Sequence, residues 1–183
     1  TLGNGEIFLG SKFHTQWQFD QQMFLPTSLL AAELSANEKR QAIEQFAVEH
    51  GYPVILKPDI GMVGKGIIKI SAADELDSCI DKLAGVYILQ KFTPHQFEAG
   101  IFYVRQNGQA KITGINQKHF PTVVGNGVDS LLTLAKNHYR YTHHWSAFLR
   151  YFDTDRVPVK GEEICLCFIG SHTLGCKFTD ASG

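Results

Sequence analysis

The stretch PVILKPDIGMVGKG, residues 53–66, decides the fold of this protein, because it joins an apolar strand to a glycine-rich loop. Residues 54–57 indicate a buried strand that ends in Lys57, and residues 67–70 indicate a second strand. A parallel crossover needs a longer connection, so the pair is predicted to be an antiparallel hairpin. Glycines let the backbone approach a polyphosphate closely with its N–H groups pointing inward. On these residues alone, a purely structural loop with a lysine at its edge stays open as the alternative.

The spacing excludes two familiar phosphate-binding loops. Gly66 follows Lys65 where a P-loop needs Ser or Thr, and Asp59 stands where the first glycine of that motif is required. A dinucleotide fingerprint fails as well, because the glycines are spaced G-x-x-G-x-G and the loop returns into a strand instead of a helix.

The residues around this stretch indicate a small α+β lobe. Ser35 and Glu38 form a capping-box pattern ahead of a helix that Gly51 ends. A second helix is expected to begin near Ser71, and residues 86–91 indicate a third strand. Helices on one face of an antiparallel sheet are therefore predicted for residues 31–93, after a lead-in segment over residues 1–30.

Residues 94–183 are expected to form part of a second lobe. Residues 97–105 alternate as a strand, Asn107-Gly108 is a tight-turn signal, and residues 110–116 return as the partner strand.

Farther along, Asp129 is expected to cap a short helix, residues 137–151 to be helical or irregular, and residues 163–170 to form a last strand. This lobe looks short of strands when the sequence stops at Gly183. We therefore expect the sequence to be a piece of a longer protein.

Residues 89–93, LQKFT, followed by Glu98, indicate a second place of contact with a nucleotide. A chain passing between lobes exposes backbone groups that can read the edge of an adenine, while Phe92 covers its face. A carboxylate such as Glu98 can accept hydrogen bonds from ribose hydroxyls, as acidic residues do in dinucleotide sites. A strand with a surface glutamate is the plainer interpretation of the same residues.

Taken together, these segments resemble the ATP-grasp superfamily, over most of the chain. The resemblance implies an α+β fold of two small lobes with antiparallel sheets, of which the C-terminal lobe is incomplete. Residues 53–58 resemble the strand that ends in a phosphate-binding lysine, residues 61–66 the mobile glycine loop, and residues 87–92 the adenine-contacting hinge, where many members carry Glu in place of Gln90. The nucleotide-binding residues implied are Lys12, Lys57, Gly61, Gly64, Lys65, Gly66, Gln90, Lys91, Phe92, Glu98 and Lys118.

The resemblance also implies a reaction. Members of the superfamily use ATP and Mg²⁺ to form an acyl phosphate on a small carboxylate substrate, which an amine or thiol acceptor then attacks. The chain is accordingly expected to belong to an ATP-dependent carboxylate–amine or carboxylate–thiol ligase. A non-catalytic nucleotide-binding module of the same fold and a structural α+β domain remain the alternatives.

The metal ligands of the superfamily are not found. They normally lie on late strands as acidic residues with an Asn, and no acid-x-Asn segment precedes Gly183. Five acidic residues are candidates by charge alone: Asp153, Asp155, Glu162, Glu163 and Asp180. We expect that the ligands lie beyond the sequence given.

The composition limits the classes of partner and the location that we expect for the protein. The formal net charge of −1 predicts no nucleic acid partner, and the longest apolar runs are too short to cross a bilayer. Four cysteines without a disulfide-framework spacing, and no signal segment, predict a cytoplasmic protein. Zinc ligation by Cys165, Cys167, His172 and Cys176 is less favoured than packed thiols, because structural zinc sites use gaps of two to four residues at turns. The oligomeric state is not predicted.

Overall fold

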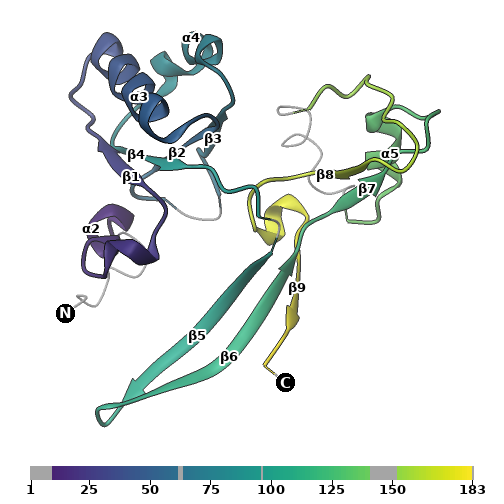
Figure 1. Ribbon diagram of the computed structural model, residues 1–183. Helices are drawn as coiled ribbons and strands as arrows, with labels where there is room; N and C mark the ends of the chain where they lie inside the picture. Colours follow the sequence, from purple (N-terminus) through teal and green to yellow (C-terminus); the bar gives the residue numbers. More distant parts are fainter. Residues whose placement is uncertain (1–9, 62–63, 96, 141–151, 183) are drawn as a thin grey trace. The chain divides into compact units, whose positions relative to one another are not determined.

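The computed structural model describes residues 10–61, 64–95, 97–140 and 152–182 (Figure 1). The chain divides between Pro94 and His95 into two compact units, residues 1–94 and residues 95–183. None of the helices in the described ranges is long and apolar enough to cross a membrane.

The first unit is built on a four-stranded antiparallel sheet in the order β1-β4-β2-β3. The strands are β1 (Thr27–Leu30), β2 (Val54–Pro58), β3 (Ile68–Ile70) and β4 (Tyr87–Lys91). Its helices are α2 (Lys12–Gln16), η1 (Gln21–Met23), α3 (Ala36–His50), η2 (Ala73–Glu75), α4 (Leu76–Cys79) and η3 (Ile80–Lys82). The predicted antiparallel pairing of β2 with β3 is confirmed.

Helix α3 begins and ends where its sequence predicts. The Ser35 hydroxyl accepts a hydrogen bond from the Glu38 N–H at 3.3 Å, and Glu38 Oε2 accepts one from the Ser35 N–H at 2.8 Å. The helix stops at Gly51, whose φ of 81° suits a residue without a Cβ. The capping-box prediction is therefore confirmed.

The helix expected from Ser71 is a series of short turns instead. It consists of η2, α4 and η3, and Glu75 accepts a hydrogen bond from the Ser71 N–H at 2.8 Å. Without a side-chain cap on η2, α4 or η3, no single long helix forms.

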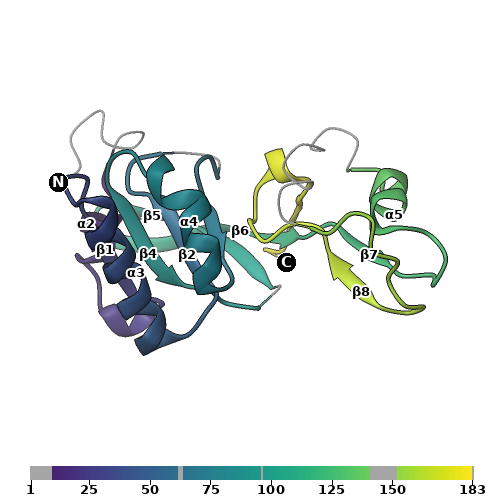
Figure 2. The same cartoon turned by 90° about the horizontal axis from the view of Figure 1, so that it is seen from above.

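The core of the first unit lies on one face of its sheet. Helices α3 and α4 cover this face side by side, and α2 lies on the other side of the sheet (Figures 1 and 2). Val54 and Leu56 on β2 are fully buried against Ile43 of α3 and Leu76 of α4 in one cluster. Because side chains alternate along a strand, the residues between them point to the opposite face.

Strand β1 lies inside the segment expected to be a lead-in. Its residues pair with β4, from Thr27 opposite Gln90 to Leu30 opposite Tyr87. Only Leu30 of the four is buried, so the strand carries too little apolar periodicity to be recognised from sequence. Backbone pairing with β4 holds it in place.

The second unit contains a three-stranded sheet in the order β5-β6-β9, a two-stranded sheet of β7 and β8, and one short α-helix, among its described residues. The elements are β5 (Glu98–Gln106), β6 (Gln109–His119), β7 (Thr122–Val124), α5 (Leu131–Asn137), β8 (Glu163–Cys165), η4 (His172–Leu174) and β9 (Lys177–Asp180). The predicted turn between β5 and β6 is confirmed: Asn107 and Gly108 both have positive φ, 51° and 78°. A smaller core forms between α5 and the β7–β8 pair.

Two details of the second unit differ from expectation. The last strand was expected over 163–170, but β8 ends at Cys165, and the strand that pairs with β6 is β9. Only Phe178 in β9 is a large apolar residue, so periodicity could not indicate it. The cap of α5 is Ser130, whose hydroxyl accepts from the Thr133 N–H, and not Asp129. Of the segment 137–151, residues 141–151 lie outside the described residues.

We predict that Leu56→Ala lowers the free energy of unfolding by about 2–5 kcal/mol, because it opens a cavity in the core of the first unit. The matched control is Leu29→Ala on β1, whose side chain is 39% exposed and should cost less than about 1 kcal/mol. Urea unfolding of the intact chain compares the two. Equal losses would contradict this assignment of the core face.

Candidate functional site

The sheet face opposite the core carries the polar residues of the first unit. On β2, Ile55 and Lys57 alternate with the core residues and so lie on this second face. Gln90 of β4 is opposite Ile55, and Thr27 of β1 is opposite Gln90. The antiparallel register therefore brings together polar residues from three strands that are far apart in sequence.

A chain of hydrogen bonds joins these residues. Lys57 Nζ donates to Gln90 Oε1 at 3.0 Å, and Gln90 Nε2 donates to Thr27 Oγ1 at 3.2 Å. Thr27 Oγ1 also accepts from Gln16 Nε2 at 3.3 Å, which ties in α2. The lysine is thus held in place by a neutral amide and not by a carboxylate.

Two lysines of the site carry charges that the protein does not fully compensate. Burial lowers the pKa of Lys57, and the nearby positive charge of Lys12 lowers it further, while Asp59 opposes both effects. Burial also lowers the pKa of Lys12, again opposed by Asp59. Because the two ammonium groups repel each other, an anion bound beside them would be stabilised.

Asp59 organises the start of the loop and was not recognised as part of the site. It is buried, with 6% of its surface exposed, and its Oδ1 accepts from the Phe13 N–H at 2.9 Å. Lys12 Nζ donates to the carbonyl oxygens of Pro58 at 3.1 Å and Asp59 at 2.9 Å. These bonds attach the beginning of α2 to the end of β2. The sequence feature that could have indicated Asp59 is its position directly after Pro58, at the end of the strand.

Lys69 is a second residue that the sequence analysis did not assign to the site. It pairs with Ile55, so it lies on the same face as Lys57. Its Nζ is 4.4 Å from the centroid of the Phe92 ring, a cation–π contact. The alternation Ile68-Lys69-Ile70, with both isoleucines directed to the core, is the signal that could have identified it.

The glycine loop follows directly after Pro58, the last residue of β2. Gly61, Lys65 and Gly66 are exposed, and Gly64 and Gly66 have φ values of 75° and 74°, in the left-handed region that favours glycine. A Cβ on Gly66 would lie only 2.8 Å from Pro58 Cγ. Residues 62 and 63 lie outside the described residues.

The end of β4 offers fewer backbone donors than expected. The Lys91 N–H donates to the Pro26 carbonyl at 3.0 Å, and the Phe92 N–H donates to the Pro53 carbonyl at 3.3 Å. Lys91 itself is exposed and Phe92 is half-buried. These two N–H groups are therefore occupied within the first unit.

Glu98 and Lys118 lie in the second unit, where they form an ion pair. They are opposite each other in the β5–β6 register, and Lys118 Nζ bonds Glu98 Oε1. Lys118 Nζ also lies 5.5 Å from the centroid of the Phe178 ring. Gly170 packs so closely on the Glu98 carboxylate that a Cβ there would be 2.1 Å from Oε2. Each charge is thus compensated by the other.

No metal centre is formed by the described part of the chain. Within it, no group of three or more His, Cys, Asp or Glu side chains could hold an ion. Glu162, one of the five acidic candidates, pairs with Arg156 at 2.8 Å. The described residues do not fit the expected Mg²⁺, and no chemical step is assigned to it.

Comparisons with known proteins bear on the fold. No family model and no curated protein matches the sequence. Among solved structures, D-alanyl-alanine synthetase A from Vibrio cholerae O1 biovar eltor matches with a TM-score of 0.50 and 14% identity, over 63% of this chain and 34% of its own. An N5-carboxyaminoimidazole synthetase from Staphylococcus aureus, complexed with ADP, matches with a TM-score of 0.48 and 16% identity, over 72% of this chain and 36% of its own.

The chain thus spans about a third of the length of these solved structures. The likeness to the first of them shows that this chain has the fold of a part of that synthetase, in agreement with the ATP-grasp fold that its motifs predicted. The predicted α+β class with antiparallel sheets is confirmed with it.

We predict that Lys57→Met does not destabilise the protein at pH 7 and raises its free energy of unfolding by up to about 1 kcal/mol, because it removes a buried charge repelled by Lys12. The pKa of Lys57 is lowered on folding, so the cost of its charge disappears as pH rises from that lowered value towards 10.5. The advantage of the variant should shrink over the same range. Urea unfolding as a function of pH measures it.

The control is Lys82→Met, which changes an exposed lysine of the same unit. Its stability difference from the wild type should not vary in this way with pH. If Lys57→Met lowered the free energy of unfolding as much as a core truncation does, the charge of Lys57 would not be destabilising.

Proposed function

We propose that this chain is the nucleotide-binding part of an ATP-dependent ligase that joins a carboxylate to an amine or a thiol through an acyl phosphate. One observation carries the proposal. Lys57 lies on the non-core face of an ATP-grasp sheet, with a lowered pKa, a neutral hydrogen-bond partner and the glycine loop directly after its strand.

The charge distribution supports a polyphosphate as the ligand. Lys57 and Lys69 lie on this face and Lys12 is close to Lys57, while the charge of Asp59 opposes the lowering of the pKa of Lys12 and Lys57. Phosphate oxygens would supply the missing negative charge and would raise the pKa of Lys57 towards its ordinary value. Exposed backbone at Gly61 and Gly66 suits close approach of the same groups.

Recognition of the base is proposed at the end of β4. The Lys91 and Phe92 N–H groups are already hydrogen-bonded, so they are not assigned to the base. We assign the Phe92 ring, which Lys69 Nζ contacts, the role of covering the face of adenine. For Glu98 and Lys118, which belong to the second unit, the resemblance implies contacts with a ribose and with phosphate. Both roles require that a ligand replaces the ion pair between them.

In the proposed reaction, a substrate carboxylate oxygen attacks the γ-phosphorus of ATP. The new P–O bond forms as the bond to the β-phosphate oxygen breaks, and ADP leaves. Lys57 and Lys12 would stabilise the negative charge on the transferring group. An amine or thiol then attacks the acyl carbon, and phosphate leaves. The identity of both substrates is left open.

A non-catalytic nucleotide-binding module is the second candidate. In this candidate the chain holds the nucleotide at the same face of the first unit without transferring its phosphoryl group. The self-compensating Glu98–Lys118 pair is compatible with it. Release of ADP from ATP, measured with and without small carboxylates, separates the two candidates.

We predict that Lys57→Ala weakens ATP binding about tenfold or more, because it removes a charge-assisted contact with phosphate. Isothermal titration calorimetry of the 183-residue chain with MgATP measures the dissociation constant. Lys82→Ala, at an exposed lysine of η3 in the same unit, is the matched control and should bind as the wild type does. Equal affinities for both variants would refute the site.

For the second unit, we predict that Glu98→Gln weakens ATP binding several-fold and leaves the affinity for inorganic tripolyphosphate unchanged or higher. The carboxylate is assigned to the ribose, which tripolyphosphate lacks, and its removal frees Lys118. Parallel titrations with the two ligands distinguish these effects. A parallel loss for both ligands would mean that Glu98 acts only through the fold.

A further inference from the structure

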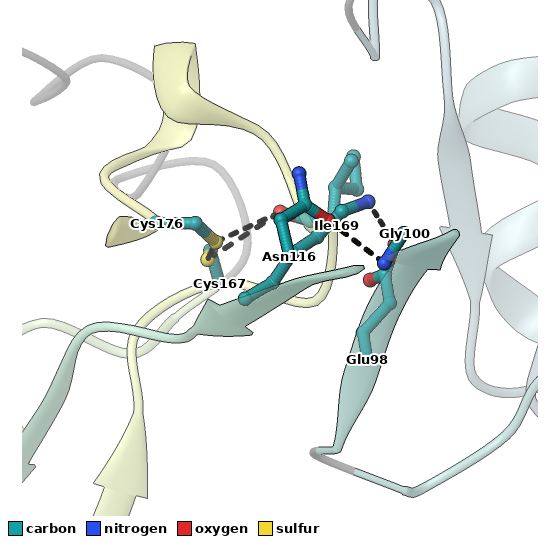
Figure 3. A network of polar contacts seen from close by, with 7 residues as sticks. Glu98, Gly100, Asn116, Cys167, Ile169 and Cys176 are labelled. Atoms are coloured by element: carbon teal, nitrogen blue, oxygen red, sulfur yellow. Dashed lines mark hydrogen bonds and ion pairs between the residues drawn. The ribbon is translucent and has the colours of Figure 1, made fainter. Parts of the chain in front are cut away.

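Two thiols of the second unit lie close together outside the proposed nucleotide contacts. Cys167 follows β8 and Cys176 immediately precedes β9, and their Sγ atoms are 3.6 Å apart (Figure 3). Both thiols also point to the carbonyl oxygen of Ile169, at 3.7 Å from Cys167 Sγ and 3.4 Å from Cys176 Sγ. All four cysteines of the chain are free.

Metal binding does not account for this arrangement. Cys165 is nearby, but its Sγ donates to the Cys167 carbonyl at 2.9 Å, and no group of three ligands suited to a metal occurs among the described residues. The Cys167 thiol interacts with the thiols of both Cys165 and Cys176, and Cys176 is the partner whose Sγ lies 3.6 Å away. Formation of a disulfide, with its S–S bond of about 2.05 Å, would need the two atoms to approach by roughly 1.5 Å.

The two cysteines differ in burial and in how firmly their backbone is held. Cys176 is fully buried and its backbone is anchored, because Arg140 donates to the carbonyl oxygens of Gly175 at 2.9 Å and Cys176 at 3.0 Å. Cys167 is half-buried and lies beyond the end of β8. Closure of the pair would therefore move the Cys167 side of the segment more than the Cys176 side.

That segment touches the ion pair of the second unit. Gly170 stands three residues after Cys167 and packs directly on the Glu98 carboxylate. Figure 3 shows both thiols directed at the Ile169 carbonyl oxygen, and the Asn116 side chain of β6 accepting a hydrogen bond from the Gly100 N–H of β5. A displacement of residues 167–170 would thus change the contacts of Glu98 and of its partner Lys118.

We propose that Cys167 and Cys176 are a redox-active dithiol, which a peroxide oxidises to a disulfide that shifts the segment packed on Glu98. The step balances as two thiols and one H₂O₂ giving one disulfide and two molecules of water. One thiolate attacks a peroxide oxygen, the O–O bond breaks, and a sulfenic acid and hydroxide form. The second sulfur attacks the sulfenic sulfur, the S–O bond breaks, and water leaves.

Thiolate character at Cys176 supports this chemistry. The hydrogen bond with Cys167 lowers the pKa of Cys176, and burial opposes that effect. The hydrogen bonds with Cys165 and Cys176 raise the pKa of Cys167, so Cys176 is the thiolate of the pair. The thiolate is the form that reacts with peroxides. Because the two sulfurs are in contact, the same disulfide results whichever is attacked first.

The first experiment treats the reduced chain with hydrogen peroxide and counts thiols. We expect the four thiols to fall to two, a mass loss of two hydrogens, and a linked peptide pair containing Cys167 and Cys176, all reversed by dithiothreitol. Cys176→Ala and Cys167→Ser should lose the linkage, and the controls Cys79→Ser and Cys165→Ser should keep it. Absence of a disulfide in the wild type, or a linkage that includes Cys165, would overturn the proposal.

The second experiment tests the effect on Glu98 and rests on the proposed function. The dissociation constant for ATP should differ by about fivefold or more between the oxidised and reduced chains, and peroxide should not change it in Cys176→Ala. Equal constants with the disulfide present would overturn the coupling to Glu98. If the reduced chain binds no ATP while the disulfide forms, the proposed function fails and the dithiol stands.

Discussion

The structure of the first unit depends on the alternation of side chains along β2. Val54 and Leu56 enter the core beneath α3 and α4, and this requirement directs Ile55 and Lys57 to the other face. A shift of register by one residue would exchange the two faces, burying a lysine in the core and exposing leucine. The strand therefore holds its site through the same contacts that hold the fold.

The polar face is assembled at a cost to stability. Burial and the neighbouring Lys12 both act against the charge of Lys57, and the amide of Gln90 orients the lysine without neutralising it. The negative charge of Asp59 opposes both effects on the pKa of Lys57. Such strain is expected where binding, and not folding, has determined the residues.

In the second unit, the charges of the candidate residues are compensated in a different way. Its two candidate contacts, Glu98 and Lys118, neutralise each other across β5 and β6, so a ligand must compete with an existing pair. A side chain at Gly170 would have to displace the Glu98 carboxylate. The position of the Glu98 carboxylate is thus linked to the conformation of residues 167–176. Cys167 and Cys176 are the first and last residues of this segment.

The sequence by itself determined the local elements: the helix capped by Ser35, the hairpin of β2 and β3 around the glycine loop, and the Asn107-Gly108 turn, because each is encoded within a few neighbouring residues. Its motifs also indicated the ATP-grasp fold. Only the tertiary structure decided that β1 and β9 are strands, since their backbone pairing comes from partners more than fifty residues away in sequence. The same holds for the proximity of Lys12 to Asp59, the place of Lys69 on the Lys57 face, and the contact between Cys167 and Cys176. These depend on register and packing between distant segments, which no local pattern specifies.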